Sequence, residues 1–309
     1  MDARPSPRLL GGLLAAAIVG GAVVMSIAGD EHSVRDYPAA TYGAATLHEA
    51  QQAAPPPSNA DAMARLTSSP RHGEWVIIQL GKNATTGTND STRAWIVFPG
   101  RPDKAPVVVV IHEIFGLSPW VRAMTDQLAA DGFIAIAPDF ITMKKVPGNP
   151  VDGPDRNLAS PVIRALASEE VNRQIDAVAR YAMALPAATQ KYGVVGYCWG
   201  GAASFNHAIH SPSLGAAVVY YGRSPAPATA SSIRAPVLGL YGSNDAGVNQ
   251  TIPPVDSALK ALGKSFAQHV FEGAGHGFLR QQTIQANLDA SRKAWPLTVQ
   301  FFRTHLEAR

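Results

Sequence analysis

Residues 193–201 read GVVGYCWGG, and they contain Cys198, the only cysteine among 309 residues. The run that leads to it, KYGVVGY, is apolar toward its end and predicts a buried strand, and the run after it, GGAASFNHAIH, predicts a helix. Gly196, Cys198 and Gly200 therefore form the pattern G-x-C-x-G at a sharp turn from strand to helix. Such a turn needs small residues on both sides because it brings the two backbones close together.

A lone cysteine can be a small buried hydrophobe, a redox thiol or a nucleophile. G-x-C-x-G is the pattern of a nucleophile elbow in which cysteine replaces serine. The backbone N–H of Trp199, at the start of the predicted helix, would point into the site and favour an anion there. The pattern alone fits a structural cysteine in a glycine-rich turn as well as it fits a nucleophile. Residues elsewhere in the chain are needed to distinguish the two.

The remaining sequence alternates strands and helices from about residue 105 onward. Continuously apolar runs, typical of strands buried on both faces, occupy 105–112, 132–139, 191–197, 214–222 and 235–242. Helices are predicted over 119–131, 168–185, 201–210, 254–262 and 287–306. A hairpin of residues 73–80 and 93–100 comes before them. The pattern predicts the α/β class, with a mostly parallel central sheet and helices on both faces, and with its chemistry at the carboxyl ends of the strands.

The N-terminus is predicted to carry an export signal. Arg4 and Arg8 precede an uncharged stretch from residue 9 to residue 29. Residues 1–29 are therefore predicted to be a signal peptide or a membrane anchor, and Ser26 and Ala28 favour cleavage after Ala28. We expect the rest of the chain to be exported, in the periplasm or secreted, unless residues 9–29 keep it on the membrane.

Residues 30–70 are rich in alanine, proline and small polar residues and predict a linker, which leaves 71–309 as the catalytic domain. The 26 basic and 23 acidic residues give a net charge of +3 and form no run of like charges. This balance argues against a nucleic-acid partner.

Two further residues follow predicted strands in the order that a hydrolase requires. Asp245 comes just after the strand at 235–242, and His276 directly follows the run AQHVFEGAG. The chain order nucleophile, acid, base is that of the α/β-hydrolase triad. His276 would take the proton from Cys198 and return it to the leaving group, while Asp245 would hold the imidazole tautomer.

The run VVVVIHEIFGL supplies a fourth element of the site. Its strand ends at His112, Glu113 follows, and Ile114 is where this fold takes its second oxyanion-hole N–H, beside that of Trp199. The letters HEIFG resemble the start of a zinc-binding H-E-x-x-H, but position 116 is glycine. We therefore expect no metal and no cofactor.

HEIFGL, APDF, GYCWGG, YYG, SNDAG and GHGFLR together resemble the dienelactone hydrolase (carboxymethylenebutenolidase) family of the α/β-hydrolase superfamily, over about residues 74 to 306. The resemblance implies a triad of Cys198, Asp245 and His276. It also implies that Glu113 helps to ionise the thiol when substrate arrives.

Substrate contacts follow partly from the same resemblance. Family members that act on dienelactone hold its carboxylate with two arginines, and Arg280 occupies the first of these places. The place of the second arginine is taken by Met143, which is followed by Lys144 and Lys145. Either lysine could supply a positive charge, but neither could bind a carboxylate through two parallel N–H groups as arginine does.

Tyr220 and Tyr221, at the end of a strand, are further candidates for lining the pocket.

The sequence thus predicts an exported hydrolase that opens a small ester or lactone through a thioester on Cys198. Two alternatives stay open. One is a cysteine hydrolase of thioesters, peptides or other carboxylic esters, and the other is a non-catalytic binding protein that retains the fold. The substrate and the oligomeric state are not predicted.

Overall fold

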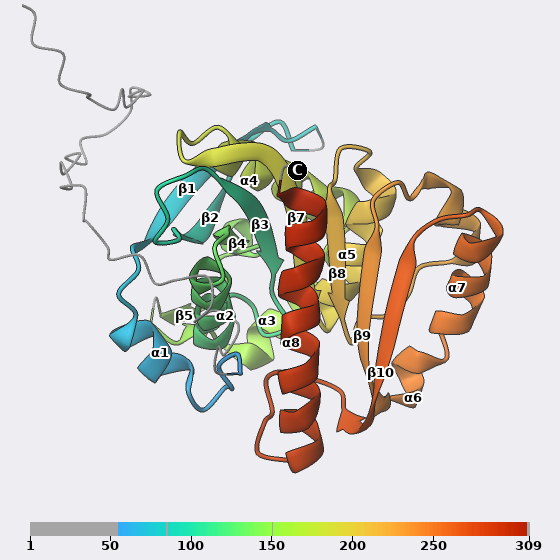
Figure 1. Cartoon of the computed structure of the whole chain (residues 1–309). Helices are drawn as coiled ribbons and strands as arrows, with labels where there is room; N and C mark the ends of the chain where they lie inside the picture. Colours follow the sequence, from blue (N-terminus) through green and yellow to red (C-terminus); the bar gives the residue numbers. More distant parts are fainter. Residues whose placement is uncertain (1–54, 85, 150, 308–309) are drawn as a thin grey trace, which may run out of the picture. The chain divides into compact units, whose positions relative to one another are not determined.

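The computed structural model describes residues 55–84, 86–149 and 151–307. Its main sheet has eight strands in the order β1-β2-β4-β3-β7-β8-β9-β10 (Figure 1). They are β1 (Gly73–Lys82), β2 (Asn89–Val97), β3 (Ala105–Ile111), β4 (Ile134–Pro138), β7 (Ala188–Tyr197), β8 (Ala216–Tyr220), β9 (Val237–Asn244) and β10 (Phe266–Gly275). β2 runs antiparallel to both β1 and β4, and every pairing from β4 to β10 is parallel. The predicted hairpin and parallel sheet are confirmed.

Helices cover both faces of this sheet, as predicted. One face carries α2 (Pro119–Ala130), α8 (Gln285–Leu306) and the short α1 (Ala62–Ser68). The other carries α4 (Ser168–Met183), α5 (Trp199–His210) and α7 (Ile252–Ala261). Alternate residues of β3 join opposite layers, with Val107 and Val109 in one core and Val108 and Val110 in the other. Strands sandwiched in this way are apolar on both sides, which explains their continuous apolar runs.

The described part of the predicted linker, residues 55–70, is not an unstructured connection but contains a helix. Residues 1–54, which hold the predicted signal and most of the linker, lie outside the described residues. Residues 62–68 form α1, which packs on α2, and Arg65 and Arg71 both pair with the buried Asp126 at 2.7 and 2.8 Å. Trp120 Nε1 also donates to the carbonyl of Pro57 at 2.9 Å. These contacts could not be predicted from the local composition, because the partner residues lie far away in the sequence.

The proline- and glycine-rich stretch after β4 contains short elements that the sequence pattern did not predict. They are the 3₁₀ turn η2 (Thr142–Lys144), the strand pair β5 (Gly148–Asn149) and β6 (Gly153–Pro154), and the helix α3 (Arg156–Arg164). α3 begins at a real cap, since Asp155 Oδ1 accepts from the N–H of Asn157 at 2.9 Å. Pro161 inside the helix hides it from a pattern search.

Two small elements complete the chain, η3 (Pro227–Ser232) and α6 (Ala246–Asn249). Within the described part of the chain, no helix has both the length and the apolar character needed to cross a membrane.

Candidate active site

Cys198 stands at the tight turn between β7 and α5. Its backbone has φ 58° and ψ −115°, in a region that residues with a side chain rarely adopt. A Cβ on Gly196 would lie 1.8 Å from the carbonyl oxygen of Gly200, and one on Gly200 would lie 2.4 Å from that of Ile111. The two glycines are therefore required for α5 to start this close to β7 and β3, and the turn holds the sulfur at the carboxyl edge of the sheet.

The side chains of Cys198, His276 and Asp245 form one hydrogen-bonded row. His276 Nε2 is 3.0 Å from Cys198 Sγ, and His276 Nδ1 is 2.6 Å from Asp245 Oδ2. The three residues follow the carboxyl ends of β7, β9 and β10, and β8 lies between β7 and β9 in the sheet. Bonding to Cys198, followed by bonding to Asp245, raises the pKa of His276 to about 9 against the opposing effect of burial. The His276 imidazole is therefore favoured in its protonated form at neutral pH.

Two backbone N–H groups near the elbow have no acceptor among the described residues. One belongs to Trp199, the first residue of α5, where the helix leaves its N–H groups unpaired. The other belongs to Ile114, just beyond β3, in a turn closed by the N–H of Gly116 donating to the carbonyl of Glu113 at 3.1 Å. Both residues line the same cavity as Cys198, so the predicted oxyanion donors are brought together.

Glu113 points at Arg280. Its Oε2 lies 3.0 Å from Arg280 Nε, although the contact lacks the alignment of a hydrogen bond. The Glu113 side chain is buried, and that of Arg280 is 15% exposed. Burial raises the pKa of Glu113 to about 7, while Arg280, His276 and Arg156 act in the opposite direction. A carboxyl group with this pKa changes its charge near neutral pH, as an acid–base group in a hydrolase should.

These groups line a cavity of about 510 Å³ with largely apolar walls. Seven predicted site residues contribute to it: Glu113, Ile114, Cys198, Trp199, Tyr221, His276 and Arg280. Its volume is that of a site for a small molecule. Asp245 does not line the cavity and reaches it only through His276.

Tyr220 does not line the cavity, which differs from the prediction. It is fully buried, and its hydroxyl hydrogen-bonds Thr298 Oγ1 of α8 at 2.7 Å. Tyr221 does line it, with its ring centroid 5.3 Å from that of His276. The sequence pair YY gave no sign that the two rings have different surroundings.

Neither predicted lysine reaches the cavity. Lys144 pairs with Glu170 of α4 at 2.9 Å, and Lys145 lines a different hollow beside β5. Three arginines that were not predicted from the sequence lie around the site instead. Arg164 and Arg223 line the cavity, and Arg156 lies 5.2 Å from the centroid of the Phe115 ring, which Arg280 also contacts at 5.1 Å. Arg164 and Arg223 come from α3 and from the loop after β8, and only the folded chain brings them here.

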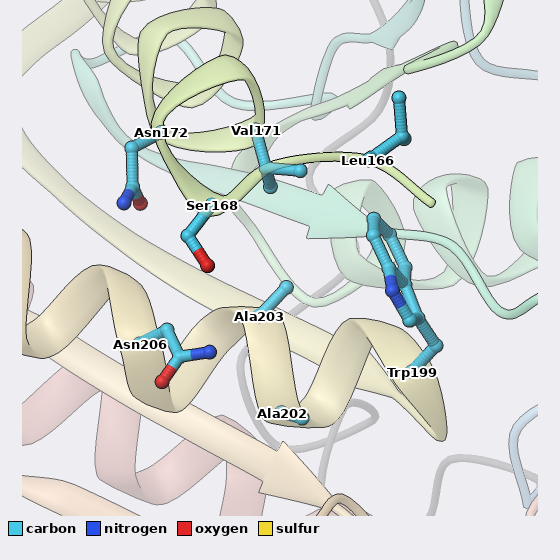
Figure 2. Close-up of a pocket in the computed structure, with 8 residues that line it drawn as sticks. All are labelled: Leu166, Ser168, Val171, Asn172, Trp199, Ala202, Ala203 and Asn206. Atoms are coloured by element: carbon cyan, nitrogen blue, oxygen red, sulfur yellow. The ribbon is translucent and has the colours of Figure 1, made fainter. Parts of the chain in front are cut away.

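A small second hollow of about 70 Å³ shares Trp199 and Ala202 with the main cavity. Figure 2 shows it between α4, which contributes Ser168, Val171 and Asn172, and α5, which contributes Ala203 and Asn206. Its volume is too small for a whole substrate, so the chemistry belongs to the larger cavity.

The parallel sheet, the elbow after β7 and the polar residues at the neighbouring strand ends define an α/β-hydrolase. The sequence profile of the dienelactone hydrolase family matches residues 92–306. The chain belongs to this family and is a hydrolase of the ester or lactone type.

Individual relatives agree with this assignment. The chain is 30% identical over 237 residues to "Putative carboxymethylenebutenolidase" of Salmonella typhimurium, which covers 73% of this chain and 87% of the relative. The fold of this chain is similar to that in the crystal structure of "Putative Dienelactone Hydrolase" from Klebsiella pneumoniae. The TM-score is 0.62, with 25% identity, and the match covers 75% of this chain and 98% of the other. Acylaminoacyl peptidase of Pyrococcus horikoshii is similar in fold alone, with a TM-score of 0.59 and 16% identity over 81% of this chain and 44% of the other.

Proposed function

We propose that this chain opens a carboxylic ester or lactone through a thioester on Cys198. The observation that carries the proposal is the hydrogen-bonded row Cys198–His276–Asp245 at the carboxyl edge of the sheet, with contacts of 3.0 and 2.6 Å. A cysteine within reach of a histidine that is itself held by a carboxylate is the arrangement of an activated nucleophile.

The steps follow from these positions. The Cys198 thiolate attacks the carbonyl carbon, and the oxygen that becomes negative accepts from the N–H groups of Ile114 and Trp199. As the C–O bond breaks, His276 gives its proton to the leaving oxygen and a thioester remains. Water then attacks the thioester, with His276 as the base. The carboxylic acid leaves, and Cys198 is regenerated.

Glu113 has a separate role in this proposal, which rests on the family resemblance. Its carboxylate would take the thiol proton when substrate arrives, which requires the ionised form. In the structure it lies against Arg280 and not against Cys198. A substrate anion that competes for Arg280 would release Glu113 toward the thiol, which supports ionisation linked to binding.

The substrates are proposed to carry a negative charge. Three guanidinium groups, those of Arg164, Arg223 and Arg280, line the cavity. Within the described chain neither Arg164 nor Arg223 has a carboxylate partner, since Arg164 contacts Ser160 and Arg223 donates to the carbonyl of Gly247. Arginines are well suited to bind carboxylates because their N–H groups form a planar fork.

Two other functions remain candidates with less support. Thioesters would pass through the same acyl-enzyme and differ only in the leaving group. Peptides are less favoured because an amine leaves only after early protonation. A non-catalytic binding protein would not need Cys198, His276, Asp245 and Glu113 together in one cavity.

We also propose that the chain is exported. The support is the sequence alone, with Arg4 and Arg8 ahead of the uncharged residues 9–29. Cell fractionation should place the protein in the envelope or the medium. Full-length protein found only in the cytosol would contradict the proposal.

The test of the hydrolase proposal is a panel of aryl esters, lactones, thioesters and dienelactone, assayed on the full chain. Intact-mass analysis of the quenched reaction should show an acyl adduct that peptide mapping places on Cys198. Hydrolysis without an adduct, and with full activity in Cys198→Ala, would exclude the thioester route.

A further inference from the structure

His112 lies directly behind the two candidate oxyanion donors. It follows β3, is fully buried, and does not line the cavity. Its ring stacks on that of Trp199, with centroids 5.7 Å apart and an interplanar angle of 23°, and it meets the edge of Phe140 at 5.1 Å. A histidine with these surroundings cannot exchange protons with substrate, so any contribution to the reaction must be through its neighbours.

Within the described part of the protein, the imidazole of His112 makes one hydrogen bond, to the residue that follows it in the sequence. His112 Nδ1 is 2.7 Å from the carbonyl oxygen of Glu113. A carbonyl only accepts, so Nδ1 carries the hydrogen and the neutral ring has its lone pair on Nε2. Burial lowers the pKa of His112, which favours this neutral form. Nε2 has no partner among the described residues, so the hydrogen bond through Nδ1 is the polar contact that fixes the ring.

The bond acts on the peptide that holds one oxyanion donor. The carbonyl of Glu113 and the N–H of Ile114 belong to the same peptide plane, and the described chain contains no cis bond. In a trans peptide these two groups point in opposite directions. The carbonyl of Glu113 accepts from both His112 Nδ1–H and the N–H of Gly116, so both of its lone pairs are used. The hydrogen bond from His112 holds the carbonyl of Glu113 on the side away from the cavity. It therefore directs the N–H of Ile114 toward the cavity.

The same residue touches the segment that holds the other donor. Its ring supports the indole of Trp199, and a Cβ on Gly200 would lie 2.5 Å from the carbonyl oxygen of His112. We propose that His112 is a positioning residue that sets the distance and direction of both oxyanion donors, through its hydrogen bond to the Glu113 carbonyl and its stacking on Trp199. This inference rests on the proposed function, because an oxyanion hole matters only if an acyl group is transferred.

The variants separate the hydrogen bond from the packing. His112→Phe keeps an aromatic ring but removes the donor. His112→Asn places an amide nitrogen as many bonds from Cα as Nδ1, so it can still donate to the Glu113 carbonyl. Phe140→Leu is the matched control, because it removes the ring that packs against both His112 and Trp199, at 5.1 and 5.8 Å, and leaves the hydrogen bond of His112 in place. Thermal melting of the full-length variants shows whether each one folds.

Two reactions of Cys198 are compared in each variant. Hydrolysis of 4-nitrophenyl acetate passes through an oxyanion, whereas alkylation by iodoacetamide forms the S–C bond and expels iodide without one. Losing an oxyanion donor costs about 10² to 10³ in kcat, so loosening one is expected to cost roughly tenfold to a hundredfold. We expect this loss in His112→Phe, with KM within about twofold and the alkylation rate unchanged. His112→Asn should recover most of kcat, and Phe140→Leu should lose little.

Each other result overturns the inference. An unchanged kcat in His112→Phe would show that the donors need no support from His112. Parallel losses of hydrolysis and alkylation, or an equal loss in Phe140→Leu, would make His112 part of the general packing. If the wild type is alkylated but hydrolyses no ester, the proposed function fails, and the inference fails with it.

Discussion

Arg280→Met tests the ion pair with Glu113 and the binding of substrate anions in one variant. Two charges 3.0 Å apart attract each other by about 5 kcal/mol at an effective dielectric constant of about 20. Removing Arg280 leaves Glu113 buried without its partner, and a carboxyl group in that position takes up a proton instead. Even a quarter of that attraction would raise the pKa of Glu113 by about one, from its value of about 7. At pH 7 the variant would then hold Glu113 mostly neutral.

The assay compares 4-nitrophenyl hydrogen succinate with its methyl ester, in which a methyl group replaces the negative charge of the carboxylate. A charge-assisted hydrogen bond is worth about 1.5 to 3 kcal/mol, so KM for the anionic ester should rise roughly tenfold to a hundredfold in Arg280→Met. KM for the methyl ester should stay nearly constant. With both substrates the rise of kcat/KM with pH should move about one unit higher, because Glu113 now ionises later. Arg101→Met, which removes a cation paired with Asp103 and Glu307 instead, is the control.

Two outcomes would refute this reasoning. An equal rise in KM for both esters would mean that Arg280 supports the structure and does not bind the anion. A pH profile that does not move would mean that the ion pair does not set the ionisation of Glu113.

Three shorter predictions concern the elbow and its surroundings. Cys198→Ala should abolish hydrolysis with an unchanged circular dichroism spectrum, and wild-type rates would exclude Cys198 as the nucleophile. Glu113→Gln should lower kcat/KM near pH 7 and recover toward pH 8.5, where a free thiol ionises by itself; a profile identical to the wild type would leave Glu113 without that role. Gly196→Ala should cost about 1 to 3 kcal/mol or more in urea unfolding, since its Cβ would lie 1.8 Å from the Gly200 carbonyl oxygen, whereas Gly247→Ala has open space and should cost little.

Several features could be predicted from the sequence because they depend on local patterns. Strands buried on both faces are continuously apolar, so the sheet and the five main helices were predicted to within a few residues. The elbow was predicted because two glycines must stand at fixed distances from Cys198. The order of Cys198, Asp245 and His276 could be recognised because each follows a strand, and parallel strands end at one edge.

Only the tertiary structure decided which charged groups share the cavity. Arg164 and Arg223 stand in segments with no distinctive pattern, and Lys144 was a candidate until its contact with Glu170 placed it elsewhere. Likewise, nothing in the letters YY separates Tyr220, bonded under α8, from Tyr221 beside His276. A strand or an elbow is specified by residues a few positions apart. The environment of a charge or a ring depends on which distant segments pack around it, and that is settled only when the chain is folded.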